Sequence, residues 1–152
     1  MAPIRFVPIG QGGRPAEEVS PLPDVAKDVC AATARLYQTS GFRPPWIGYL
    51  VLSDQLLVGT CAFSTPPQGG RVEIAYFTFP GFEGQGIATT MAGELIRIAR
   101  AAEPGIELIA QTLTVENASN SILRKLGFQL AGTVDHEEEG RVWEWRLPAQ
   151  SR

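Results

Sequence analysis

One glycine-rich stretch could bind a phosphate group. Residues 79–89 read Phe-Pro-Gly-Phe-Glu-Gly-Gln-Gly-Ile-Ala-Thr and join a strand-like run to a helix-like run. Glycines at a strand-to-helix turn can leave consecutive backbone N–H groups free, and the helix dipole favours an anion there. The stretch therefore predicts a phosphate or pyrophosphate site, although the same glycines would also serve a simple tight turn.

Two common nucleotide-binding motifs do not fit this stretch. A P-loop needs Gly-Lys-Ser/Thr, and no lysine follows these glycines. A dinucleotide fingerprint needs a third glycine where Thr89 stands, and the turn lies in the middle of the chain behind an expected antiparallel hairpin. A nucleotide hydrolase and a nicotinamide-dependent dehydrogenase are both disfavoured.

A second motif follows in residues 112–128. It contains Glu-Asn-Ala-Ser at 116–119 and Leu-Arg-Lys-Leu-Gly-Phe at 123–128. Together with the glycine turn, this pattern resembles the GNAT superfamily of acetyl-CoA-dependent N-acetyltransferases. It is most similar to the branch that contains the ribosomal-protein N-terminal acetyltransferases, and the likeness runs from about Trp46 to Leu147.

The resemblance implies a single-domain GNAT-like α/β fold over residues 1–152. Its sheet would be mixed and mostly antiparallel, with one parallel crossover and flanking helices. Coenzyme A would lie where the strand 71–79 and the strand 106–113 splay apart. The pantetheine arm would bind the first strand, the pyrophosphate would bind backbone N–H groups of the turn, and the second helix would flank the coenzyme. The implied binding residues are Phe77, Thr78, Phe79, Glu83, Gly84, Gln85, Gly86, Ile87, Ala88, Asn117 and Ser119.

The start of the glycine motif departs from the family. Relatives usually begin it with Gln or Arg, whereas Gly81 or Glu83 stands there in this chain. We infer that backbone amides dominate pyrophosphate binding and that Glu83 points to solvent.

Acyl transfer to a mostly protonated amine benefits from a general base. Glu73 lies in a stretch similar to the one in which several GNAT enzymes carry a base glutamate, so it is the expected base. The alternative is that its carboxylate holds a neighbouring loop or Arg71. Leu123 stands where many relatives have the tyrosine that protonates the leaving thiolate, so Ser119 is expected to assist, or else to cap a helix. Tyr76, on the alternate strand face, is expected in the core.

The elements that position these residues follow from apolar periodicity. We expect an N-terminal strand, then a helix over 25–39 with Asp24 as its N-cap. Val25, Val29, Ala32 and Leu36 would form the buried stripe of that helix. The remaining elements are a hairpin at 46–53 and 56–64, a strand at 71–79, helices at 86–102 and 118–126 around a strand at 106–113, and a closing hairpin at 128–134 and 141–147.

Composition restricts the partners. A formal net charge of −3 argues against nucleic acid. The absence of a long apolar run argues against a membrane span, and Cys30 and Cys61 are expected to be buried free thiols in a cytoplasmic protein. No metal site is expected. The acidic turn of Asp135 and Glu137–Glu139 either attracts a cationic acceptor or is a solvated tip, beside an exposed His136.

The sequence thus predicts an enzyme that moves acetyl from acetyl-CoA to a primary amine by direct attack in a ternary complex. The acceptor would be a small molecule or a peptide, and the protein a monomer or homodimer. Two alternatives stay open: transfer of a longer acyl group, and a catalytically weak module that binds coenzyme A or a partner.

Overall fold

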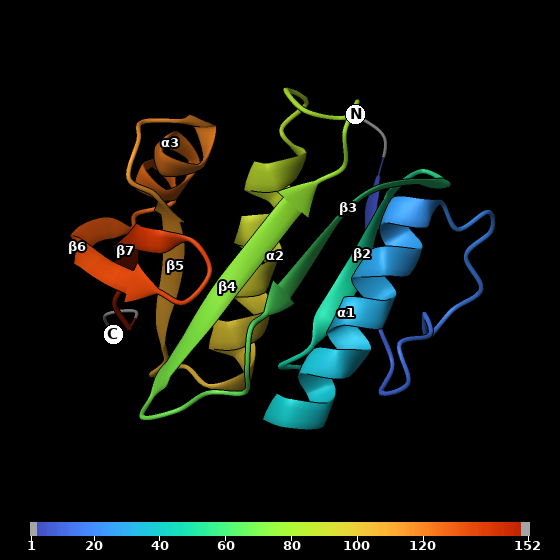
Figure 1. Cartoon of the computed structure of the whole chain (residues 1–152), viewed down its shortest axis with the longest axis horizontal. Helices are drawn as coiled ribbons and strands as arrows, with labels where there is room; N and C mark the ends of the chain where they lie inside the picture. The colour runs from blue at the N-terminus through green and yellow to red at the C-terminus, as the bar shows by residue number, and fades with distance from the viewer. Residues whose placement is uncertain (1–2, 150–152) are drawn as a thin grey trace.

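A computed structural model describes residues 3–149 of the chain. In this part of the chain seven strands and three helices follow one another as expected from the sequence (Figure 1). They are β1 (Ile4–Pro8), α1 (Asp24–Ser40), β2 (Gly48–Ser53), β3 (Leu56–Phe63), β4 (Arg71–Thr78), α2 (Ile87–Ala102), β5 (Glu107–Leu113), α3 (Ala118–Lys125), β6 (Gln129–His136) and β7 (Gly140–Leu147).

The strands form one sheet in the order β1-β2-β3-β4-β5-β7-β6. Every neighbouring pair is antiparallel except β4 and β5, which are parallel and joined through α2. A parallel pair needs such a crossover, because its two strands start at the same edge of the sheet. The predicted fold class, a mixed and mostly antiparallel sheet with one parallel crossover, is confirmed.

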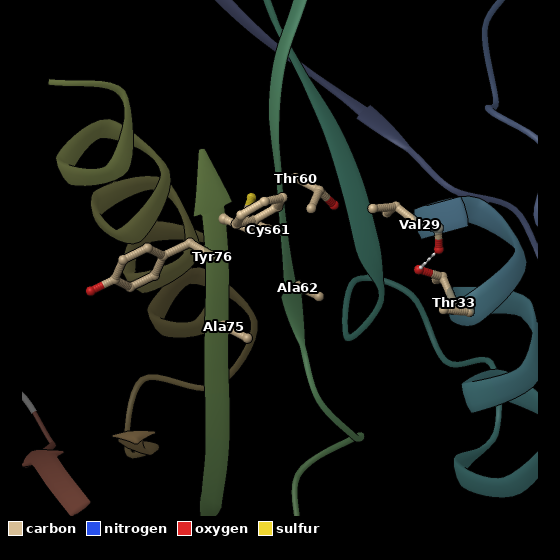
Figure 2. Close-up of a pocket in the computed structure, with 9 residues that line it drawn as sticks. Val29, Thr33, Thr60, Cys61, Ala62, Ala75 and Tyr76 are labelled. Atoms are coloured by element: carbon tan, nitrogen blue, oxygen red, sulfur yellow. Dashed lines mark hydrogen bonds between the residues drawn. The ribbon is translucent and has the colours of Figure 1, made fainter. Parts of the chain in front are cut away.

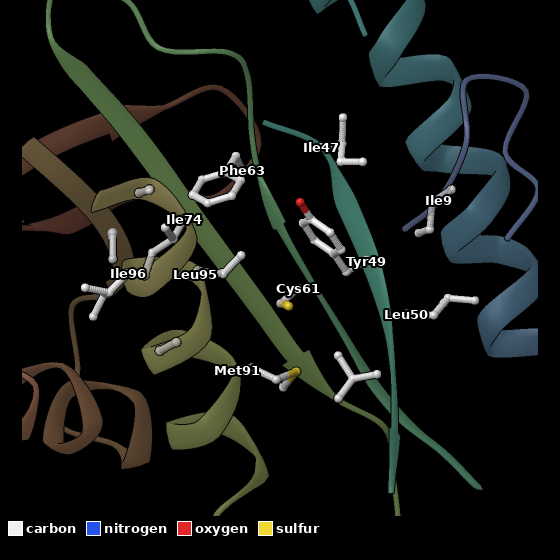
Figure 3. Close-up of a cluster of buried hydrophobic side chains, with 14 of the residues drawn as sticks. Ile9, Ile47, Tyr49, Leu50, Cys61, Phe63, Ile74, Met91, Leu95 and Ile96 are labelled. Atoms are coloured by element: carbon white, nitrogen blue, oxygen red, sulfur yellow. The ribbon is translucent and has the colours of Figure 1, made fainter. Parts of the chain in front are cut away.

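The helices α1 and α2 lie on opposite faces of the sheet (Figure 1). Met91 and Leu95 of α2 are fully buried and belong to the same apolar cluster as Cys61 and Ile74 of the sheet (Figure 3). Cys61 and Cys30 are both buried and free, as expected. None of the three helices within residues 3–149 is both long and apolar enough to span a bilayer.

Two details of α1 differ from the expectation. Pro23 is the N-cap and Asp24 is the first helical residue, and no side chain caps the helix. The buried face is formed by Ala26, Cys30 and Tyr37, whereas Leu36 is 39% exposed. The Tyr37 hydroxyl fixes this rotation, because it donates to the Ile9 carbonyl at 2.8 Å and accepts from the Gly48 N–H at 2.9 Å.

This rotation of α1 brings residues of its expected buried stripe toward the surface. Val29 is only partly buried and Ala32 is exposed, although both belong to the expected buried stripe. The spacing of the apolar residues in α1 is compatible with burial of either of two adjacent helix faces. The hydrogen bonds of Tyr37 determine which face packs against the sheet. The other face leaves small apolar side chains at an open groove described below.

Candidate active site

The parallel strands β4 and β5 separate after a short paired segment. Only Arg71–Glu73 of β4 pair with Glu107–Ile109 of β5. Beyond Glu73 a cavity of about 120 Å³ lies between the strands, lined by β4, β5 and Ser119 of α3, and we call it the strand gap. The splay expected from the family resemblance is therefore present, and Glu73 is the last paired residue at its closed end.

The glycine turn leads from β4 into α2. Gly84 and Gly86 have φ angles of 78° and 79°, which other residues rarely adopt, and a β-carbon at either position would point into open space. Gly86 is the N-cap of α2 without any side-chain cap. Among residues 3–149, no hydrogen-bond acceptor is found for the backbone N–H groups of residues 84–89, so this helix start is open to an anion.

A cavity of about 560 Å³ lies over this turn and reaches β4 and α3. It is lined by most of the predicted coenzyme-binding residues: Phe77, Thr78, Glu83, Gly84, Gly86, Ile87, Ala88 and Ser119. It is also lined by residues that the sequence reasoning did not select, namely Tyr76, Phe82, Thr89, Ala118 and Ile122. We call this cavity the turn cleft.

Three predicted binding residues do not line the turn cleft. Phe79 is 2% exposed, and its N–H donates to the Val58 carbonyl at 2.8 Å. Gln85 is exposed on the turn. Asn117 caps α3, since its side-chain oxygen accepts from the Asn120 N–H at 3.1 Å. Their predicted roles in binding coenzyme A therefore lack support from the cavity geometry.

Glu83 is exposed, as expected, but its carboxylate is not free in solvent. It accepts from the Gly81 N–H at 2.8 Å and thereby ties the turn together. The Gly81 N–H is therefore already paired with a side chain. The N–H groups that stay open in the described part of the turn are those of residues 84–89.

Glu73 lies between the strand gap and a second, larger cleft. This cleft of about 690 Å³ is also lined by His136 and Glu139, and we call it the acidic cleft. Burial raises the pKa of Glu73, His136 lowers it, and Glu144 raises it further. Within the described residues no hydrogen bond or ion pair joins its carboxylate, and Arg71 instead pairs with Glu107 at 2.6 Å, so the alternative of an Arg71 partner is wrong.

Tyr76 was expected in the core, but its side chain is only half-buried. Its hydroxyl oxygen is buried and has no hydrogen-bond partner among the described residues. Burial raises its pKa, and the nearby Ser119 hydroxyl lowers it, although no hydrogen bond of normal geometry joins the two. Tyr76 lines both the turn cleft and the acidic cleft, and it also lines the strand gap.

Ser119 is not the cap of α3, because Asn117 has that role. Ser119 instead lines the turn cleft and the strand gap. Leu123, at the family's usual tyrosine position, is fully buried. The hydroxyl groups available at the meeting point of these cavities are therefore those of Tyr76 and Ser119.

The acidic turn has an internal organisation. His136 is half-buried rather than fully exposed, and its Nδ1 accepts from the N–H groups of Glu138 and Glu139 at 3.1 Å each. Glu137 and Glu138 are exposed tip residues, whereas Glu139 lines the acidic cleft. In residues 3–149 no group of three or more His, Cys, Asp or Glu side chains is placed to hold a metal ion.

Solved structures share this fold. The apo ribosomal L7/L12 α-N-protein acetyltransferase RimL matches with a TM-score of 0.70 at 17% identity, over 98% of this chain and 95% of that one. The ribosomal-protein-S5-alanine acetyltransferase of Vibrio fischeri gives 0.65 at 14% identity, over 82% and 71%. The microcin C7 self-immunity acetyltransferase MccE, solved with acetyl-CoA and AMP, gives 0.64 at 15% identity, over 82% and 70%. At such identities the likeness establishes the acetyltransferase fold.

The sequence itself establishes the family. Residues 16–129 match the acetyltransferase (GNAT) domain, which covers most of the chain. The chain belongs to this family, and the expectation of an acetyl-CoA-dependent N-acetyltransferase is confirmed at the level of the family. No curated protein matches the sequence.

Proposed function

We propose that this protein transfers the acetyl group of acetyl-CoA directly to a primary amine in a ternary complex. The observation that carries the proposal is the continuity of the site. The turn cleft, the strand gap and the acidic cleft meet at Tyr76, with Glu73 beside them and Ser119 between the first two. The proposal places the coenzyme in the first cleft and the acceptor in the last.

The coenzyme-binding part of the proposal relies on backbone groups. The pyrophosphate would accept hydrogen bonds from the open N–H groups of residues 84–89. The pantetheine arm would follow the edge of β4 beyond Glu73, where β5 no longer supplies ladder partners. Acetyl-CoA supplies an activated acetyl group, and the protein supplies its orientation.

Glu73 is the proposed general base. Its half-buried carboxylate has no ionic partner in the described part of the chain and a raised pKa, which makes it a better proton acceptor near neutral pH. Glu73 takes the proton that the amine nitrogen loses as that nitrogen bonds to the acetyl carbon.

Tyr76 is the proposed general acid. Its hydroxyl gives its proton to the coenzyme sulfur as the carbon–sulfur bond breaks and the electron pair stays on sulfur. A tyrosine, with an ordinary pKa of about 10, is much closer to a thiol at about 8.5 than a serine hydroxyl is. Ser119, which lies near the Tyr76 hydroxyl, would return a proton to Tyr76 from solvent.

Charge and neighbours support an amine acceptor. Glu73 and Glu139 face the acidic cleft, where a cationic amine gains from the negative potential. Two of the similar structures are named as acetyltransferases of ribosomal proteins, which is consistent with a peptide or protein amine. The two free buried thiols suit a reducing cytoplasm.

The proposal is tested by incubating the protein with acetyl-CoA and a panel of primary amines, following thiol release and product mass. An amine-dependent release of one thiol per acetylated product is expected. Tight acetyl-CoA binding by calorimetry without turnover of any amine would favour the binding-module alternative. Faster turnover of a longer acyl-CoA would favour the alternative of a different acyl group.

A further inference from the structure

A fourth cavity, of about 220 Å³, lies on the α1 side of β4 (Figure 2). Three elements form its walls: α1 with Val29, Ala32 and Thr33, β3 with Thr60 and Ala62, and β4 with Ala75. We call it the α1 groove. It occupies the face that the rotation of α1 leaves without a partner.

The α1 groove offers an apolar surface. None of its lining residues carries a charge. The two threonine hydroxyls donate within the protein, Thr33 to the Val29 carbonyl at 2.7 Å and Thr60 to the Tyr49 carbonyl at 2.9 Å. A ligand in this groove would therefore meet mainly carbon, which favours aliphatic or aromatic groups over polar ones.

The groove adjoins the acceptor side of the proposed active site. Tyr76 and Phe77 line both the α1 groove and the acidic cleft. Ala75 lies between Glu73 and Phe77 on the same face of β4, and it is small and exposed. At about 3.3 Å per residue, the α1 groove begins roughly 7 Å from Glu73 along the strand.

The two neighbouring cavities differ in charge. The acidic cleft is lined by two carboxylates, Glu73 and Glu139, together with His136, whereas the α1 groove is lined by no Asp, Glu, Lys, Arg or His side chain. A molecule that spans both would be cationic at one end and uncharged and apolar at the other. A polyamine or a lysine side chain would place a charge against carbon, which is unfavourable.

We propose that the α1 groove binds an uncharged apolar group attached to the acceptor, so that the substrate class is primary amines with an aliphatic or aromatic substituent close to the nitrogen. This inference rests on the proposed function, because it takes the reacting nitrogen to lie at Glu73.

Amino-acid amides test the preference, because they present the same α-amine with different side chains. The wild-type protein is expected to acetylate leucinamide and phenylalaninamide with kcat/KM values about 10-fold or more above that of glycinamide, as is usual for a filled apolar pocket. Lysinamide and aspartic acid diamide, which carry a second charge or a polar group, should not exceed glycinamide.

Filling the groove should remove this preference. Ala62→Leu enlarges a half-buried residue of β3, and Ala32→Leu enlarges an exposed residue of α1 where leucine suits the helix. Both variants should lower kcat/KM for leucinamide toward the glycinamide value and leave the glycinamide value unchanged. Ala101→Leu, on an exposed position of α2 away from the groove, is the matched control and should keep the full preference.

The possible outcomes distinguish a failure of the proposed groove from a failure of the proposed acetyl transfer. Equal kcat/KM for glycinamide and leucinamide in the wild type, or a preference that survives in both groove variants, would overturn the inference. Methyl NMR of Ala62 and Ala75 gives a readout without turnover: leucinamide should shift these signals and glycinamide should not. Shifts without acetylation of any amide would contradict the proposed function alone, and no shifts with leucinamide would contradict the groove.

Discussion

The two sides of β4 are built in different ways. On the side of the turn cleft, the open groups are backbone N–H groups of residues 84–89, presented by glycines at the start of α2. On the proposed acceptor side, the acidic cleft and the α1 groove are lined by side chains from α1, β3, β4, β5 and the β6–β7 turn. The first site follows from local chain geometry, whereas the second depends on how distant elements pack.

This difference has a consequence for specificity. A backbone site can bind the same phosphate groups with many different side chains around it, as long as the glycines keep their φ angles. A side-chain site changes its ligand whenever one wall residue changes size or charge. The coenzyme should therefore be shared across the family, and the acceptor should depend on residues such as Ala62, Ala75 and Glu139.

The largest expected effect on coenzyme binding comes from placing an anion in the turn cleft. In Gly86→Asp, a carboxylate about 6 Å from the pyrophosphate would cost about 3 kcal/mol at an effective dielectric constant of about 20, or roughly 100-fold in affinity. Calorimetric titration with acetyl-CoA measures this loss. Gly86→Asn, which has nearly the same shape without the charge, should lose much less.

A matched control separates charge from backbone strain. Gly70 also has a positive φ, at 77°, with open space where a β-carbon would stand, and it lies in the turn before β4. Gly70→Asp should therefore show a similar loss of stability but normal affinity for acetyl-CoA. Unchanged affinity in a folded Gly86→Asp variant would refute this location for the pyrophosphate.

The next largest effect concerns Tyr76. Tyr76→Phe should lower kcat by about 10²-fold, at the lower end for general acid catalysis because a thiolate is a fairly good leaving group. A buried hydroxyl without a partner destabilises the fold, so the same variant should raise Tm. Steady-state kinetics and thermal unfolding measure the two effects.

Tyr37→Phe is the matched control, because its expected effects on Tm and kcat are the reverse of those of Tyr76→Phe. The Tyr37 hydroxyl makes two hydrogen bonds inside the fold, so its removal should lower Tm and leave kcat nearly unchanged. If Tyr76→Phe instead lowers Tm and keeps kcat, Tyr76 is a structural residue, and proton donation must come from Ser119 or water.

The smallest expected effect is a gain of stability in Glu73→Gln. Because the folded pKa of Glu73 is raised, the folded protein holds this proton more tightly than the unfolded chain does. The contribution of Glu73 to the stability of the wild type should therefore fall as pH rises from the ordinary value of 4.5 through the folded pKa, and stay lower above it. Glu73→Gln should therefore have a higher Tm than the wild type at neutral pH, by about 2–4 °C for each kcal/mol gained.

The sign of that effect is informative. Well below pH 4.5 the carboxyl is protonated in both states, so wild type and Glu73→Gln should have nearly the same Tm. A variant that is less stable than the wild type at neutral pH would mean that the Glu73 carboxylate makes a stabilising contact.

Much of the backbone could be predicted from the sequence. The order of elements, the parallel crossover and the open glycine turn follow from local periodicity and glycine positions, because these depend on neighbouring residues. The rotation of α1 could not be predicted in this way, because it is fixed by hydrogen bonds from Tyr37 to Ile9 and Gly48, which are far apart in the sequence.

The predictions for the site residues show the same contrast between local sequence pattern and long-range packing. Ser119 was expected either to assist catalysis or to cap a helix, and only packing reveals that Asn117 occupies the cap. Tyr76 was expected in the core because it lies on the alternate strand face from Glu73, but β4 and β5 separate at that point and leave its hydroxyl at the meeting point of the cavities. Alternation along a strand predicts which face a residue takes, and it does not predict where a sheet opens.

The central claim is that Glu73 accepts the proton of the amine, and the kinetics of Glu73→Gln test it most directly. With the best acceptor amine, kcat at neutral pH should fall by about 10²–10⁴-fold while the calorimetric Kd for acetyl-CoA stays within a few-fold, and raising the pH should partly restore kcat as free amine forms. Glu139→Gln, which removes a carboxylate from the same cleft, should mainly raise KM for the amine. Near-normal kcat of Glu73→Gln at neutral pH, or an equal loss of kcat in Glu139→Gln, would contradict the account.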